Sequence, residues 1–133
     1  MRSIFAVLAL SAIALGSQSA MADPAPQPPG TPPRCFFVQQ FQNWKAPDPK
    51  TIFIRVNVNQ YYRLDLGASC SNLMYPSAHL ITQWQGTSTV CTGLDWNLQV
   101  SQGYPSARQA CIVKTQTPLT PAEVAAIPRK YKP

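Results

Sequence analysis

Four cysteines carry the clearest chemical signal in this sequence, because their types and spacing favour one kind of bond. They are Cys35, Cys70, Cys91 and Cys111, each about twenty or more residues from the next. Metal-binding and redox-active cysteines are typically found in close C-x-x-C pairs. An even number of widely spaced cysteines therefore predicts two structural disulfides, with no metal site and no cofactor.

The pairing of the four cysteines has three possible forms. We predict Cys35–Cys111 with Cys70–Cys91, because Cys35 opens the first predicted strand and Cys111 lies in the last. These two strands become neighbours if the sheet closes on itself. The chain-entropy model assigns about 4.5 kcal/mol to the longer loop and about 3.4 kcal/mol to the shorter one. The other two pairings stay open at this point.

The sequence gives only weak evidence for a catalytic site. His79 is the only histidine, so a Ser-His-Asp triad would need a serine and an aspartate from distant segments. Two-carboxylate glycosidase chemistry has only Asp65 and Asp95 as candidates in the folded part. The acids have structural interpretations in a leader, two turns, a cross-strand pair and a helix cap: Asp23, Asp48, Asp95, Asp65 and Glu123. We expect that the chain is not an enzyme.

A candidate binding face combines basic and aromatic residues. Two predicted strands, Thr51–Val58 and Tyr61–Leu66, alternate apolar with other residues. Four residues then project from the side opposite the apolar set: Phe53, Arg55, Tyr61 and Arg63. Guanidinium and aromatic groups on one sheet face suit an anionic envelope glycan or an acidic protein surface. The alternative is a solvated face on which Arg55 pairs with Asp65. Nucleic acid is not an expected partner.

The elements that would position these residues are short strands. Stretches rich in aromatic and β-branched residues are separated by turn-forming clusters: Cys35–Trp44, Thr51–Val58, Tyr61–Leu66, Leu80–Trp84, Ser88–Cys91, Leu94–Val100 and Ala110–Thr115. This spacing predicts a mostly β domain over residues 35–118, a small closed or nearly closed, barrel-like antiparallel sheet. An odd-numbered loop between the second and third stretches keeps both apolar sets on one side. We predict the loop Asn59–Tyr61, with Val58 opposite Tyr62 and Arg55 opposite Asp65.

The C-terminal segment has a helix-start signal. Thr120 can cap, Pro121 suits the first helical position and Glu123 completes a capping box. We predict a short helix over residues 119–128 that docks on the sheet or frays. Residues 129–133 form a basic tail, which we expect to be mobile.

The N-terminal segment resembles an export signal. Arg2, an apolar run and an A-x-A exit predict a signal peptide over residues 1–22, cleaved between Ala22 and Asp23. Residues 23–34 form a proline-rich, extended leader. Cleavage would lower the net charge from +6 to about +5, and no second long apolar run follows. We expect a periplasmic or secreted protein with no membrane span in the mature chain.

The chain resembles a family of small exported proteins of Gram-negative bacteria that is known only as a domain of unknown function. The resemblance covers residues 35–128 and rests on spaced cysteines and structural positions: Cys35, Tyr62-Arg63-Leu64, Cys70, Leu73, Cys91, Gly93, Asp95, Cys111 and the closing LTPAEVAAIP. It implies a periplasmic location and disulfides, and it supplies no catalytic residue. The leading functional hypothesis is a non-enzymatic binding or structural module. The alternatives are a secreted inhibitor of a hydrolase and, third, a hydrolase that uses His79.

Overall fold

The computed structural model describes residues 33–84, 88–103 and 108–133, which form a mostly β structure. The strands are β1 (Phe36–Phe37), β2 (Phe41–Asp48), β3 (Thr51–Val56), β4 (Gln60–Leu66), β5 (His79–Trp84), β6 (Thr89–Val90), β7 (Trp96–Ser101), β8 (Arg108–Cys111) and β9 (Val113–Pro118). One α-helix, α1 (Pro121–Ala126), and four 3-10 turns complete the described part: η1 (Val38–Gln40), η2 (Ser71–Met74), η3 (Gly93–Asp95) and η4 (Arg129–Tyr131).

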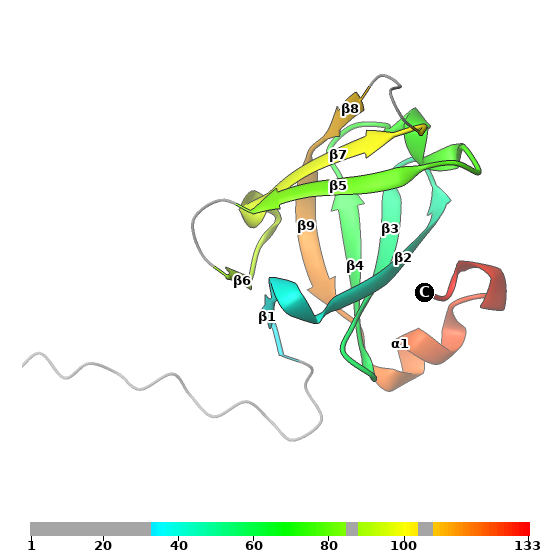
Figure 1. Cartoon of the computed structure of the whole chain (residues 1–133). Coiled ribbons are helices and arrows are strands. Elements are labelled where there is room, and N and C mark those ends of the chain that lie inside the picture. Colours follow the sequence, from blue (N-terminus) through cyan, green and yellow to red (C-terminus); the bar gives the residue numbers. More distant parts are fainter. Residues whose placement is uncertain (1–32, 85–87, 104–107) are drawn as a thin grey trace, which may run out of the picture.

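The strands form three open antiparallel sheets. Their orders are β2-β3-β4-β9, β5-β7-β8 and β1-β6. The mostly β prediction is therefore confirmed, whereas the closed, barrel-like sheet is wrong. The physical reason is that β2 and β9 lie at opposite edges of the four-stranded sheet and do not pair with each other. Figure 1 shows β5 and β7 running across the strands of the four-stranded sheet.

A corner at Ile112 joins the two larger sheets. β8 pairs with β7 in one sheet, and β9 pairs with β4 in the other, with Ile112 alone between them. The carbonyl of Ile112 accepts a hydrogen bond from the amide of Gly67 at 2.9 Å. A register shift beside Leu66 marks the bend in the ladder. Chains commonly change sheets at such bends in crossed-sheet packings.

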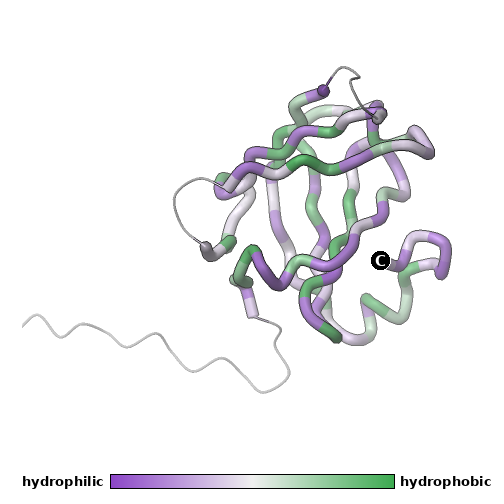
Figure 2. The backbone as a smooth tube through the Cα atoms, in the orientation of Figure 1, coloured by the Kyte–Doolittle hydropathy of each residue, from purple (hydrophilic) through white to green (hydrophobic). Residues whose placement is uncertain are grey.

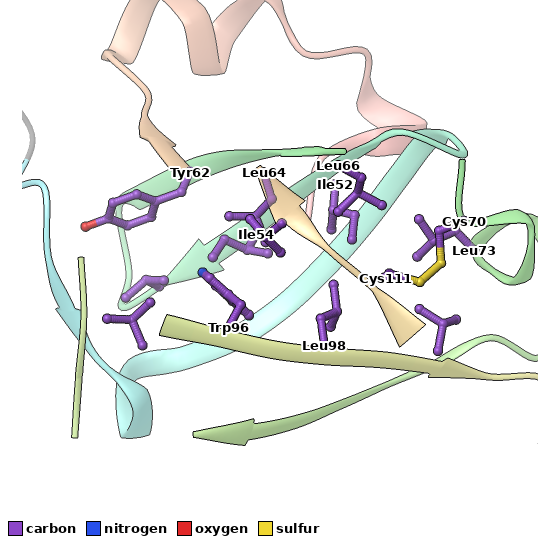
Figure 3. Packing of buried hydrophobic residues seen from close by; sticks show 14 of the residues in the cluster. Ile52, Ile54, Tyr62, Leu64, Leu66, Cys70, Leu73, Trp96, Leu98 and Cys111 are labelled. Atoms are coloured by element: carbon purple, nitrogen blue, oxygen red, sulfur yellow. A yellow bond between two sulfur atoms is a disulfide. The ribbon is translucent and has the colours of Figure 1, made fainter. Parts of the chain in front are cut away.

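The core fills the space between the two larger sheets. β3 and β4 contribute one face each, since every second residue from Ile52 to Val56 and from Tyr62 to Leu66 is buried. In Figure 3, Trp96 and Leu98 of β7 face these side chains from the other sheet. Figure 2 shows the same change between hydrophobic and hydrophilic residues along the strands. The period-two pattern thus decides which face is buried.

The β3–β4 hairpin keeps the predicted faces but not the predicted register. Arg55 lies opposite Tyr61, and Asp65 lies opposite Thr51, so the predictions for Arg55 with Asp65 and Val58 with Tyr62 are wrong. The loop has three residues, 57–59, and Val58 is 75% exposed. Asn57 has a positive φ of 54°, a conformation that asparagine tolerates better than β-branched residues. The turn therefore begins two residues earlier than predicted.

The disulfides differ from the predicted pairing. The structure joins Cys35 to Cys91 and Cys70 to Cys111, so Cys35–Cys111 and Cys70–Cys91 are wrong. β1 pairs with β6 rather than with the last strand, and the pair Phe36–Val90 places Cys35 beside Cys91. The second bond ties the start of η2 to the end of β8, and both of its cysteines are buried in the core.

The C-terminal helix has the predicted start, and the segment after it folds back. The Thr120 amide donates to Glu123 Oε2 at 2.8 Å, and the Glu123 amide donates to Thr120 Oγ1 at 3.4 Å. The helix ends at Ala126, and the basic tail contains η4. Pro133 is buried, and Lys132 Nζ lies 5.9 Å from the centre of the Tyr61 ring. The expected mobile tail is thus part of the folded domain.

The N-terminal predictions fall mostly outside the described residues. The signal segment 1–22, its Ala22–Asp23 cleavage point and leader residues 23–32 are not covered by the structure. The last leader residues contact the domain, since the Pro33 carbonyl accepts a 2.9 Å hydrogen bond from the Tyr62 hydroxyl. Across the described ranges, no helix has the length and apolarity needed to span a membrane.

Candidate functional site

The four residues of the predicted face lie together on the outer side of the four-stranded sheet. Phe53 is directly opposite Arg63, and Arg55 is directly opposite Tyr61. The rows continue onto the neighbouring strands, because Lys45 of β2 pairs with Phe53 and Thr117 of β9 pairs with Arg63. Directly opposite residues share a face of the sheet. We call this surface the outer face: Lys45, Phe53, Arg55, Tyr61, Arg63, Asp65 and Thr117.

Arg63 is held by an acid on its own strand. Its Nε lies 3.2 Å from the carboxylate of Asp65, and the two side chains are 46% and 36% exposed. Asp65 also accepts a hydrogen bond from the Thr115 hydroxyl at 2.9 Å. Residues two apart on a strand project to the same side, which explains the contact. The charge of Arg63 is therefore partly balanced before any ligand arrives.

Arg55 is less accessible than Arg63. Its Nε is buried and has no hydrogen-bond partner within the described part of the chain. Its cross-strand neighbour Tyr61 lies beneath Lys132, with the ammonium 5.9 Å from the ring centre. A buried N–H without an acceptor costs free energy.

A cleft opens where the outer face meets α1. It has a volume of about 240 Å³ and is lined by Phe53, Arg63, Leu119, Glu123, Ala126, Ile127 and Pro128. Leu119 and Ile127 are both 7% exposed and anchor the segment on the sheet. In Figure 1, α1 and the C-terminus lie beside β2, β3 and β4. The cleft combines an apolar lining with one guanidinium and one carboxylate.

Two carboxylates serve as local caps. Hydrogen bonds from the backbone of Cys91 and Thr92 hold the pKa of Asp95 below its ordinary value. The backbone and hydroxyl of Thr120 lower the pKa of Glu123 in the same way, with a smaller contribution from Arg63. Each acid therefore stays ionised near neutral pH and organises the start of η3 or α1. Asp65 is bonded to Arg63 and Thr115, whereas Asp95 is bonded to the backbone of Cys91 and Thr92.

His79 lies at the exposed start of β5, in the three-stranded sheet. No carboxylate of residues 33–84, 88–103 and 108–133 forms an ion pair with it. The same ranges contain no group of three or more His, Cys, Asp or Glu residues that could hold a metal ion. Ser101 lies directly opposite His79 in the β5–β7 ladder, so within the described ranges His79 has a serine neighbour but no ion-paired acid.

The sequence patterns did not predict the cleft between α1 and the outer face. Strand alternation identified Phe53 and Arg63, and the capping box identified Glu123, but nothing linked these two signals. Leu119 and Ile127 flank a helix whose own residues are mostly exposed. Such an apolar pair at both ends of a short helix is the signal that could have indicated docking on the sheet.

The chain belongs to the family described as "Family of unknown function (DUF6491)", whose model matches residues 1–131. This membership agrees with the resemblance to a domain of unknown function. Comparison with the curated proteins and with the solved structures found no match. A function must therefore be inferred from the chain's own residues.

Proposed function

We propose that this chain is an exported, non-enzymatic binding module of the cell envelope, and that its outer face contacts an anionic glycan. Two disulfides support export, because such bonds form and persist in oxidising compartments. The signal-like segment over residues 1–22 supports it as well. The periplasm is the compartment that best fits both features.

The observation that carries the proposal is an imbalance of charge around the outer face. Five cations lie on it or on η4 and the residue after it, and none forms an ion pair within the described ranges: Lys45, Arg55, Arg129, Lys130 and Lys132. The four side-chain carboxylates of those ranges each have another partner: Asp48, Asp65, Asp95 and Glu123. Unbalanced cations on one face attract anionic ligands and raise their association rate.

The aromatic residues favour a glycan as the anion. Phe53 and Tyr61 are half-buried on the outer face, one in each cross-strand row. The C–H groups of a sugar ring can pack on the negative face of an aromatic ring, while carboxylates of an acidic sugar contact guanidinium and ammonium groups. A surface that alternates aromatic rings with cations therefore suits a polymer that has both sugar rings and carboxylates.

The non-enzymatic part of the proposal is supported by the roles of the acids. Asp95 and Glu123 cap local turns, and Asp65 holds Arg63. Each of these carboxylates thus has a structural role in the described residues. General acid–base chemistry would instead require a titratable group placed against a bound substrate.

Binding of a carboxylated polysaccharide tests the proposal. We expect polygalacturonate to bind the purified protein and neutral dextran to bind far more weakly, in isothermal titration calorimetry at low ionic strength. The affinity should fall as salt rises, because the screening length shrinks from about 10 Å at 0.1 M to about 3 Å at 1 M. Lys130→Ala with Lys132→Ala should weaken binding, whereas Lys114→Ala, an exposed cation on β9, should not. Equal affinity for both polymers would contradict the proposal.

A further inference from the structure

The cleft between α1 and the outer face is too small for an extended ligand. Its volume is about 240 Å³. Pockets that enclose drug-sized molecules have volumes of about 300–1,000 Å³. The cleft therefore has room for a single ring or a single side chain, and the rest of any longer ligand must lie along the sheet.

The polar groups of the cleft offer both a donor and an acceptor. The Nε of Arg63 contacts Asp65, and its terminal nitrogens have no hydrogen-bond partner in the described residues. Glu123 Oε2 accepts hydrogen bonds from Thr120, and Oε1 accepts none from the described part of the chain. The cleft thus presents free guanidinium N–H groups and one free carboxylate oxygen.

A purely anionic group does not suit this pair. Arg63 already has two carboxylates near it, because Asp65 is in contact with it and Glu123 lines the same cleft. A ligand carboxylate beside Glu123 would meet a like charge. A hydroxyl group, which donates to the carboxylate and accepts from the guanidinium, satisfies both residues.

We infer that this cleft is a subsite for one pyranose ring, with the apolar face of the ring on Phe53 and its hydroxyl groups on Arg63 and Glu123. The inference rests on the proposed function and adds to it, because it assigns the ring to the cleft and the anionic groups to the cations at Lys132 and Arg55. Leu119, Ile127 and Pro128 complete an apolar wall that a C–H-rich ring can contact. Neighbouring sugar units then extend toward Tyr61 along the outer face.

Methyl glucoside and glucuronate are the probes that test the subsite. We expect amide signals of Phe53, Ala126 and Ile127 to shift when methyl glucoside is titrated into the purified, isotope-labelled protein in the millimolar range. Phe53→Leu keeps an apolar side chain but loses the ring, and it should weaken methyl glucoside binding about tenfold, which corresponds to about 1.4 kcal/mol. Phe37→Leu is the matched control, because Phe37 is 53% exposed on β1, outside the cleft.

A second variant removes the negative charge of Glu123. Glu123→Gln keeps an acceptor for the capping box, which accommodates glutamine. This variant should weaken methyl glucoside binding and improve glucuronate binding, because the like charge is removed. A merely structural role for Glu123 would change both affinities in the same direction, and that result would overturn the inference.

The outcomes separate the two proposals. If polygalacturonate binds while Phe53→Leu and Phe37→Leu bind methyl glucoside equally well, the subsite is wrong and the proposed function stands. If methyl glucoside shifts the cleft signals while polygalacturonate does not bind, the subsite stands and the anionic-glycan function is wrong. If polyglutamate shifts the cleft signals and neither sugar does, the cleft binds acidic protein, and the inference is overturned.

Discussion

Arg63 and Asp65 form an ion pair along one strand, with the Nε of Arg63 3.2 Å from the Asp65 carboxylate. The pair lies on β4 within the outer face and has two consequences. It limits how strongly Arg63 attracts anions, and among the described residues it leaves the terminal nitrogens of Arg63 without a hydrogen-bond partner. The contact replaces the predicted cross-strand pair of Arg55 with Asp65, so Arg55 has no ion-pair partner within residues 33–84, 88–103 and 108–133.

Asp65→Asn tests this pair. We expect the variant to bind polygalacturonate more tightly, because the charge of Arg63 is no longer balanced. Its stability should change by less than about 1 kcal/mol, since exposed ion pairs contribute little, and the amide oxygen of the new side chain can still accept from Thr115. Calorimetric affinity and thermal unfolding measure the two effects. Weaker binding by the variant would show that the Arg63–Asp65 pair positions the ligand instead of competing with it.

Gly93 is in tight contact with β9, and a side chain there should displace η3. A Cβ at this position would lie 2.7 Å from the Val113 carbonyl oxygen and 2.9 Å from that of Lys114. We expect Gly93→Ala to destabilise the protein by about 1–3 kcal/mol, measured by urea unfolding. Gly67→Ala is the control, because its Cβ would meet only the Ile112 carbonyl oxygen at 3.9 Å. Equal midpoints for the two variants would contradict this packing.

The two disulfides should contribute unequally to stability. Their sequence separations are 41 residues for Cys70–Cys111 and 56 for Cys35–Cys91, for which the chain-entropy model gives about 3.9 and about 4.2 kcal/mol. Cys70 and Cys111 are only 1% and 5% exposed, so their replacement by alanine also leaves a cavity.

We therefore expect the Cys70→Ala, Cys111→Ala variant to unfold at lower urea than the Cys35→Ala, Cys91→Ala variant. Peptide mapping of the unreduced protein should recover both bonds as the structure has them. The opposite order of urea midpoints would show that the bond between β1 and the segment after β6 contributes more than the buried one.

Local patterns predicted much of the fold. Alternation placed Ile54 and Leu64 inside and Phe53 and Arg63 outside, because each strand face depends on residues two apart. The capping box placed the start of α1, since its hydrogen bonds join residues only three apart. These features need no information about distant segments.

Non-local features could not be predicted in the same way. The cysteine pairing depends on whether β1 meets β6 or β9, and alternation in either strand fits both choices. The register of the hairpin depends on where the turn begins, and the positive φ of Asn57 decided it. The cleft depends on α1 folding back over the sheet, which no local pattern specifies.

Acid should weaken the loop around Asp95. The folded-state pKa of this group is below its ordinary value of 3.8, because the backbone of Cys91 and Thr92 donates to its carboxylate. A lowered pKa contributes stability above the unfolded-state pKa, and this contribution is lost as the pH falls through the folded-state value. We expect Asp95→Asn to be less stable than wild type at about pH 6, and the difference to be clearly smaller at about pH 2, where the carboxylate gains its proton. If the urea midpoints of Asp95→Asn and wild type differ by the same amount at both pH values, the lost stability comes from packing and not from the charge of Asp95.

Binding at the outer face is tested most directly by a residue-resolved map of polygalacturonate binding, from two-dimensional NMR of the labelled protein. We predict shifts at Lys45, Phe53 and Tyr61 of the outer face and at Lys132 over the Tyr61 ring. The signals of Ile81 and Gln99 in the three-stranded sheet should stay unchanged. Shifts confined to the three-stranded sheet, or no shifts at low salt, would contradict the claim that the outer face is the binding surface.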